Sequence, residues 1–467
     1  MVGRIGMRSA RLLLAIGLTV AQAPLASVAV AETLSDAMAS AYKHSGLLEQ
    51  NQALLRAADE DVAIAQAALR PTLNYAISHG WTDPNTSISG NSAWATTASL
   101  TAEFLIYNFG RGKAAVAAQK EIVLATRDGL ISVEQQVLLR AVKAYVDVRS
   151  AVENVQLQGN SVRVLTQELR AANDRFEVGE VTQTDVALAQ ARLAAARANE
   201  ASAQGNLAIA REEYRAATGD LPGTLSAPPA LPMTANTLEA AKGIARQRHP
   251  DILAAQHNVA AADLAIEISM AAMKPALVGS AETKWQDVGG TDFVSNSVGV
   301  ALRGTVYSGG KLSAEHRKAV ANAEAARAGL HQARLAVDQG VANAWAQLAI
   351  AAASLEATER QIRASRVALR GAREEAQLGS RTTLDVLNAE QELLNAEASR
   401  ITAQSNQYLA AYSLLSAMGL LTAEHLKLGV VTYDPEAYFN TVKSAPVHRV
   451  SPQGKRLDSL LEALGKN

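Results

Sequence analysis

The chain has 467 residues, of which 48% are hydrophobic but only 4% aromatic, and its formal net charge is −1. Much of the apolar content is alanine, which favours long helices in close contact over a thick globular core. The near-neutral charge and the lack of a basic stripe with interleaved aromatics argue against nucleic acid as a partner. The chain contains no cysteine, which excludes disulfides and thiol chemistry.

Residues 1–31 have the pattern of a secretory signal peptide. Arg4, Arg8 and Arg11 precede an apolar stretch, and Ala29-Val30-Ala31 has the small-x-small form of a cleavage site. The alternative, a buried first helix, fits this charge layout less well. After cleavage no apolar run is long enough for a membrane helix. We therefore expect an exported mature chain without a helical anchor.

The rest of the chain is a tandem repeat with an offset of about 200 residues. Residues 32–221 form the first unit, residues 238–428 form the second, and the proline-containing segment 222–237 links them. Asp185 and Asp385, for example, occupy matching positions. Because neither unit is expected to bury its apolar face alone, function should depend on what the two build together.

Long helices are expected over Arg111–Val178 and Lys311–Leu378, which contain no proline and could each reach about 100 Å. Shorter helices should flank them, over Thr33–Leu69, Thr182–Thr218, Leu238–Met273 and Thr382–Met418. The economical packing sets one long helix beside a stacked pair of shorter ones. The tail, residues 429–467, is polar and contains prolines, and we expect it to be irregular.

Four strand-like stretches lie between the helices, at about 71–82, 93–107, 275–286 and 297–307. Apolar and polar residues alternate along them, which gives each strand one apolar and one polar face. Such stretches with aromatics near their ends are typical of transmembrane barrel strands. Soluble hairpins are the alternative, which the export signal disfavours. The positions predicted to face lipid are Leu100, Phe104, Ile106, Val300 and Leu302, and the predicted interface aromatics are Trp81, Trp94 and Trp285.

Four strands cannot close a barrel, so several copies of the chain should share one. The sequence offers little chemistry besides. Its histidines are scattered, and neither GRGKA at Gly110 nor SGGKL at Ser308 has the spacing of a phosphate loop. We find no nucleophile–base pair, and therefore expect no enzymatic activity, no metal and no cofactor.

Two turns that join a long helix to a shorter one carry the most specific motifs. They read VGEVTQTDV, starting at Val178, and LGSRTTLDV, starting at Leu378. In each, a glycine can end one helix and a threonine can cap the next. Asp185 and Asp385 would then exceed what the turn needs, because the threonine already caps.

With these motifs the chain resembles the TolC family of outer-membrane efflux and secretion channels, from about Glu32 to Phe439. Prolines at the start of two strands (Pro71 and Pro275) and the YNFGRG and YSGGK turns belong to the same pattern. The resemblance implies a mainly helical homotrimer with one twelve-stranded β-barrel in the outer-membrane lipid and a helical tunnel in the periplasm of a Gram-negative bacterium. It also implies two partners, a periplasmic adaptor and an inner-membrane ABC or proton-driven transporter.

The resemblance assigns roles to residues of the two turns. Asp385 matches an acidic ring at the periplasmic aperture, and Asn388 takes the next ring position, which is commonly acidic. Arg381 matches a tip arginine that latches neighbouring hairpins, and Asp185 matches its carboxylate partner. Ala376 replaces a tyrosine that often joins this latch. The segments implied to dock the adaptor are Val178-Gly179-Glu180 and Leu378-Gly379-Ser380.

The expected function is therefore the exit duct of a tripartite export system, which passes type I secreted protein, small toxic compounds, or both. The alternatives are the periplasmic adaptor of such a system and a coiled-coil scaffold. An adaptor would show one hairpin flanked by small β domains, and a scaffold would have no membrane strands.

Overall fold

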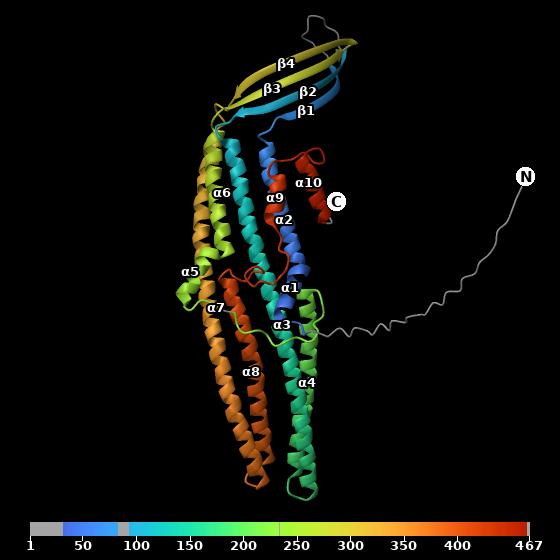
Figure 1. Ribbon diagram of the computed structural model, residues 1–467, viewed down its shortest axis with the longest axis vertical. Helices are drawn as coiled ribbons and strands as arrows, with labels where there is room; N and C mark the ends of the chain where they lie inside the picture. The colour runs from blue at the N-terminus through green and yellow to red at the C-terminus, as the bar shows by residue number, and fades with distance from the viewer. Residues whose placement is uncertain (1–30, 83–92, 233, 465–467) are drawn as a thin grey trace, which may run out of the picture.

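The computed structural model describes residues 31–82, 93–232 and 234–464. A long helical body carries a small sheet at one end (Figure 1). Two helices of 67 residues each run through most of this body, α3 (Arg111–Glu177) and α7 (Lys311–Gln377). The expected signal peptide lies outside the described residues except for Ala31, and stays a prediction.

Shorter helices pack along α3 and α7. Those of the first repeat are α1 (Leu34–His44), α2 (Gly46–Ala67) and α4 (Gln183–Thr218), and those of the second are α5 (Leu238–Arg248), α6 (Pro250–Ala272) and α8 (Thr383–Ala417). Helices α2 and α6 occupy the half nearer the sheet, whereas α4 and α8 run to the far end (Figure 1). The packing is thus a long helix beside a stacked set of shorter ones, once per repeat.

Two helices that the sequence suggested were continuous are broken. The first breaks at Ser45, whose side chain accepts a hydrogen bond from the Leu48 N–H and so starts α2. The second breaks at His249, because Pro250 has no N–H to donate to the preceding turn and instead begins α6. Both expectations were wrong because helix-capping residues were taken as helix interior.

The described strands form one antiparallel sheet in the order β1-β2-β3-β4, in which β2 and β3 join the two repeats. They are β1 (Thr72–Thr82), β2 (Ala93–Tyr107), β3 (Ala276–Val288) and β4 (Thr291–Arg303). The last strand therefore begins and ends earlier than the expected range 297–307. Gly289 and Gly290 adopt positive φ and turn the chain directly into β4. At the other end a Cβ on Gly304 would lie 2.9 Å from Cβ of Pro275, which has no N–H to extend the ladder.

The C-terminal tail is not irregular, as was expected, but contains α9 (Pro435–Val442) and α10 (Pro452–Ala463). Its prolines were taken as helix breakers. Two of them, Pro435 and Pro452, instead occupy the first helical position after the caps Asp434 and Ser451, where the missing N–H costs nothing. Helix α9 packs against α2, and α10 packs against α9.

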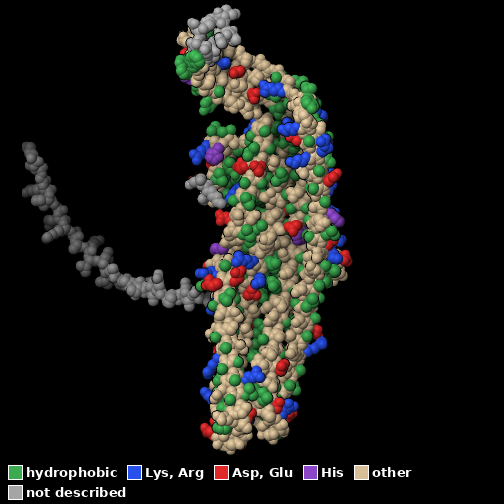
Figure 2. Space-filling view, turned by 180° about the vertical axis from the view of Figure 1, so that it is seen from behind, with side chains coloured by type: hydrophobic (Ala, Val, Ile, Leu, Met, Phe, Trp, Pro, Cys, Tyr) green, Lys and Arg blue, Asp and Glu red, His purple; other side chains and the backbone are tan. Residues whose placement is uncertain are grey.

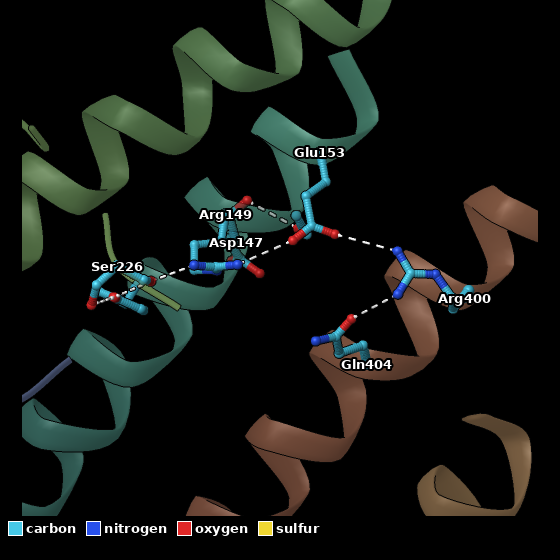
Figure 3. A network of polar contacts seen from close by, with 8 residues as sticks. Asp147, Arg149, Glu153, Ser226, Arg400 and Gln404 are labelled. Carbon is cyan, nitrogen blue, oxygen red and sulfur yellow. Dashed lines mark hydrogen bonds and ion pairs between the residues drawn. The ribbon is translucent and has the colours of Figure 1, made fainter. Parts of the chain in front are cut away.

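A polar network ties the linker and the second repeat to the middle of α3 (Figure 3). Arg149 donates to the backbone carbonyl of Ser226 in the linker and pairs with Glu153 at 3.2 Å. Glu153 lies 4.0 Å from the guanidinium of Arg400 on α8. Tyr145, which is fully buried, also donates to the Ser226 carbonyl, at 2.8 Å. The repeats therefore meet around α3.

Candidate functional site: the sheet and the helical tips

The strand register gathers the predicted lipid-facing residues on one face of the sheet. Phe104 pairs with Gly279, which pairs with Val300 on the next strand. Leu100 and Leu302 lie an even number of residues from these along their strands, and so point to the same side. These four predicted side chains are 41 to 68% exposed. The sheet thus presents an apolar face that nothing in the described chain covers.

One of the predicted positions, Ile106, lies at an irregularity. The pairing with β3 shifts between Leu105, opposite Val278, and Tyr107, opposite Leu277, so that Ile106 falls in a bulge. Its side chain is 45% exposed. Strict alternation in the sequence gave no sign of this bulge.

The tryptophans lie toward the end of the sheet that is farther from the helices. Trp81 and Trp94 are directly opposite each other, and His79 stacks on Trp94 with ring centroids 4.9 Å apart. Trp285 on β3 pairs with Val294 on β4, within the β3–β4 hairpin. Aromatics at the end of an exposed apolar strand face are typical of a membrane interface.

The opposite face of the sheet is polar. Glu103 and Arg303 form an ion pair at 3.3 Å there, and Glu282 and Lys284 share that face of β3. An apolar and a polar face on one sheet suit a wall between lipid and water. Separately, none of the helices in the described ranges combines the length and apolarity that crossing a membrane requires.

The two helical turns lie at the far end of the body, opposite the sheet (Figure 1). Gly179 and Gly379 have φ of 82° and 78°, the left-handed conformation that lets each long helix end in a tight turn. The residues before them, Val178 and Leu378, are 71% and 82% exposed. The Glu180 N–H donates back to the Arg175 carbonyl, and the Ser380 N–H donates likewise to the Glu375 carbonyl. These predicted docking segments are therefore exposed turns closed by backbone hydrogen bonds, each with an exposed apolar side chain before its glycine.

Asp185 and Asp385 are part of the helix caps, which corrects the expectation that they exceed what the turns need. Each carboxylate accepts hydrogen bonds from the backbone N–H and the hydroxyl of its threonine, Thr182 or Thr382, at 2.7 to 3.0 Å. The Thr182 hydroxyl, then its N–H, lowers the pKa of Asp185. For Asp385 the Thr382 N–H is the larger cause of the lowered pKa. Both side chains are held ionised and pointed at the turn.

The predicted latch pair is not joined within the single chain. The Nε of Arg381 lies 2.5 Å from Oε2 of Glu375 on the same hairpin. Arg381 and Asp185 nevertheless line the same groove of about 610 Å³ between the two tips. The structure brings the two residues to one place, and leaves a contact between neighbouring copies as a prediction.

Asn388, the predicted aperture residue, accepts a hydrogen bond at 3.2 Å from the guanidinium of Arg192 on α4. It therefore links the two hairpins of one chain. A second link escaped the sequence analysis: Arg373 contacts Glu168 of α3 at 3.3 Å and Glu390 of α8 at 3.0 Å. Burial raises the pKa of Glu390, and Arg373 opposes that rise. The sequence shows Arg373 within a long helix, but it does not show which residues of other elements the side chain meets.

Known proteins share this architecture. The model of the outer membrane efflux protein family matches residues 38–220 and 243–420. The chain is 33% identical to outer membrane efflux protein BepC of Brucella suis, over 91% of this chain and 94% of that protein. It is 26% identical to outer membrane protein TolC of Escherichia coli, over 86% and 85%. The structure superposes on the outer membrane protein VceC of Vibrio cholerae with a TM-score of 0.73, at 22% identity over 83% and 96%.

These matches span both repeats and confirm the expected resemblance, in place of the adaptor and scaffold alternatives. The fold is the mainly helical, twice-repeated fold of this family, with strand pairs between the helices. The chain belongs to the outer membrane efflux protein family and is a non-enzymatic efflux or secretion channel of the outer membrane that extends into the periplasm.

Proposed function

We propose that three copies of the chain form one exit duct, which receives small toxic compounds from an inner-membrane transporter through a periplasmic adaptor. The observation that carries this is the open sheet. Among the described residues β1 and β4 each leave one edge unpaired, and four strands cannot close. Three copies supply twelve strands, an even number that suits a small outer-membrane barrel.

The tips support the proposed docking of an adaptor. Val178 and Leu378 each expose an apolar side chain on a turn fixed by backbone hydrogen bonds. Exposed apolar side chains on rigid loops are suitable anchors for a partner, because little conformational entropy is lost on binding. The two turns lie beside each other around one groove.

The proposed cargo follows from the 33% identity to a protein named for efflux. A strain that lacks this chain should become more susceptible to toxic apolar compounds, and the wild-type gene should restore resistance. If susceptibility is unchanged while a secreted protein is retained in the periplasm, the duct serves protein secretion instead.

The sheet provides a matched test of the barrel. Leu100→Arg places a charge on the apolar face, where a mid-membrane arginine costs roughly 2–4 kcal/mol, whereas Thr101→Arg places it on the polar face. We expect the first variant to lose trimer from outer-membrane fractions and the second to retain it. Equal trimer yields would contradict the assigned faces.

A further inference from the structure

We propose that anionic phospholipid headgroups bind a basic rim where the sheet meets the helices, formed by Arg111, Lys113, Lys274 and Lys311. Each of these residues lies within a few positions of a strand: Lys274 precedes β3, Arg111 and Lys113 follow β2, and Lys311 follows β4. All four side chains are exposed. Figure 2 shows basic side chains gathered directly below the sheet on the face in view.

The rim has few acidic partners within the chain. Among the described residues, Arg111, Lys113 and Lys274 have no carboxylate within ion-pair distance, and Lys311 has only Glu315, at 3.8 Å. Farther down the helices some cations are paired closely, such as Arg140 with Glu213 at 2.9 Å and Arg246 with Asp338 at 2.8 Å. The charge of the rim is therefore available to an external anion.

Helix polarity adds to this excess of positive charge. Helices α3 and α7 have no acidic residue in their first turn, whereas α4 and α8 begin with Asp185 and Asp385. Cations beside the positive end of a helix are disfavoured unless an anion is close. A headgroup phosphate at the rim would offset that repulsion.

Exposed apolar side chains at the same level indicate that the anion belongs to a lipid. Tyr107 is 55% and Tyr307 86% exposed, and the Nζ of Lys274 lies 5.2 Å from the Phe109 ring centroid. Phe109 has a φ of 55°, close to the 64° of Gly309, which occupies the matching position in the second repeat. Positive φ is unfavourable for a bulky residue, so the ring is retained at a conformational cost. Aromatic rings beside basic side chains are typical of the level of lipid headgroups.

The rim also continues the membrane-facing surface. Phe104 and Leu302 on the apolar face of the sheet lie close to the ends of β2 and β4 that lead to the rim. The other end of the described sheet differs, because the β3–β4 hairpin there carries Asp287 and Asp292. Since the helices extend into the periplasm, the rim lies at the periplasmic leaflet. A phosphodiester headgroup with its acyl chains against the strands fits both the charge and the apolar surface, whereas free phosphate fits the charge alone.

The test compares lipids retained by purified trimer from mixed micelles of phosphatidylethanolamine and phosphatidylglycerol, counted by native mass spectrometry. Wild-type protein should enrich phosphatidylglycerol about fivefold or more, as expected for several basic residues near a lipid surface. The variant Arg111→Gln, Lys113→Gln, Lys274→Gln, Lys311→Gln should lose the enrichment. The matched control removes the same number of positive charges from exposed arginines farther down the helices, and it should keep the enrichment of phosphatidylglycerol. Its substitutions are Arg170→Gln, Arg197→Gln, Arg211→Gln and Arg334→Gln.

Equal enrichment in the rim variant and the wild type would overturn the proposal, as would loss of enrichment in the shaft control. Displacement of the lipid by inorganic phosphate, but not by sodium chloride of equal ionic strength, would assign the site to free phosphate instead. If the fourfold variant does not assemble, Lys274→Gln alone and a salt titration of the wild type give the answer, because electrostatic enrichment must fall as ionic strength rises. None of these outcomes depends on the cargo of the duct.

Discussion

The two repeats place an aspartate and an arginine at matching positions but give them different surroundings. In the second repeat Asp263 and Arg327 form an exposed ion pair at 2.7 Å. In the first repeat Asp59 and Arg127 lie beneath the C-terminal segment, and Asp59 is 0% exposed. Neither of its oxygens accepts a hydrogen bond from a described residue. The same two residue types form a solvent-exposed ion pair in the second repeat, whereas in the first repeat the aspartate is buried without a hydrogen bond from a described residue.

The C-terminal segment causes this difference. Arg127 donates to the Pro435 carbonyl at 3.4 Å and lies 5.2 Å from the Phe439 ring. Burial raises the pKa of Asp59 to about 6, against the lowering effect of Arg127. Arg56 and Glu60 of α2, together with Tyr433 and Tyr438 of the tail, complete the surroundings. A duplicated sequence thus acquires a titratable site only where a third element covers it.

The two long helices also differ in how far other elements of the chain cover them. Helix α3 packs against α1, α2, α4, α6 and α8, whereas α7 packs mainly against α5, α6 and α8 among the described elements. Ile350 and Val367 on α7 are 62% and 67% exposed, while the matching positions on α3 are Ser150 and Gln167. Helix α3 therefore lies inside the protomer, and α7 lies at its edge with apolar residues that a second copy can cover.

The largest expected difference between the repeats is at the middle of these helices. Tyr145 is 0% exposed, whereas the matching Trp345 is only partly buried. Tyr145→Ala should destabilise the chain by about 3–5 kcal/mol, and Trp345→Ala by clearly less. Thermal unfolding of the two purified variants measures this. Equal losses would show that the repeats are packed alike.

The aspartate pair predicts a pH effect of intermediate size. The folded-state pKa of Asp59, about 6, exceeds its ordinary value of 3.8, so docking of α9 is strongest at low pH and weakens as the pH rises through about 6. Asp59→Asn should remove this dependence and tighten α9 at pH 8, by up to roughly 3 kcal/mol. Asp263→Asn should do neither, because its site is solvated.

The mobility of a spin label at Asn440 on α9 reports this docking. The chain has no cysteine of its own, so a single cysteine introduced there labels cleanly. Wild-type α9 should become more mobile between pH 5 and pH 8, and Asp59→Asn should hold it immobile throughout. A pH response that survives in Asp59→Asn would place the titrating group elsewhere.

The smallest expected effect is at the tips, where Arg381 matches Val181 of the first turn. We expect Arg381 to pair with Asp185 between neighbouring copies and hold the duct shut. The alternative is that Arg381 is a solvent-exposed charge whose pairing contributes under about 1 kcal/mol. Arg381→Glu should raise single-channel conductance in planar bilayers, because repulsion replaces attraction. Val181→Glu adds a carboxylate at the matching position without removing a cation, and should change conductance less.

A charge reversal tests the same pair directly. Arg381→Glu combined with Asp185→Arg should restore low conductance if the two residues interact. Failure of this rescue would show that the pair is not the latch. The role predicted for Asp385 is separate. If Asp385 lies at the aperture as predicted, Asp385→Ala should weaken cation selectivity in a salt gradient, because it removes one carboxylate per copy.

Local patterns in the sequence account for most of the architecture. The long helices end at Glu177 and Gln377, one residue before the expected ends, because a run without proline followed by glycine defines a helix and its stop. The alternation that assigned Leu100 and Val300 to one face agrees with the pairing register. The two tip turns could be located for the same reason, since a turn and its threonine cap are contiguous in sequence, although the part of Asp185 and Asp385 in the caps was missed.

Contacts between segments that are distant in the sequence were determined by the tertiary structure alone. The sequence could not show that Arg373 would meet Glu168 across two hairpins, or that α9 would fold and bury Asp59. The bulge at Ile106 depends on the partner strand from the other repeat. Periodicity and capping are properties of neighbouring residues, whereas burial and the pKa of a carboxyl depend on whichever element packs over it.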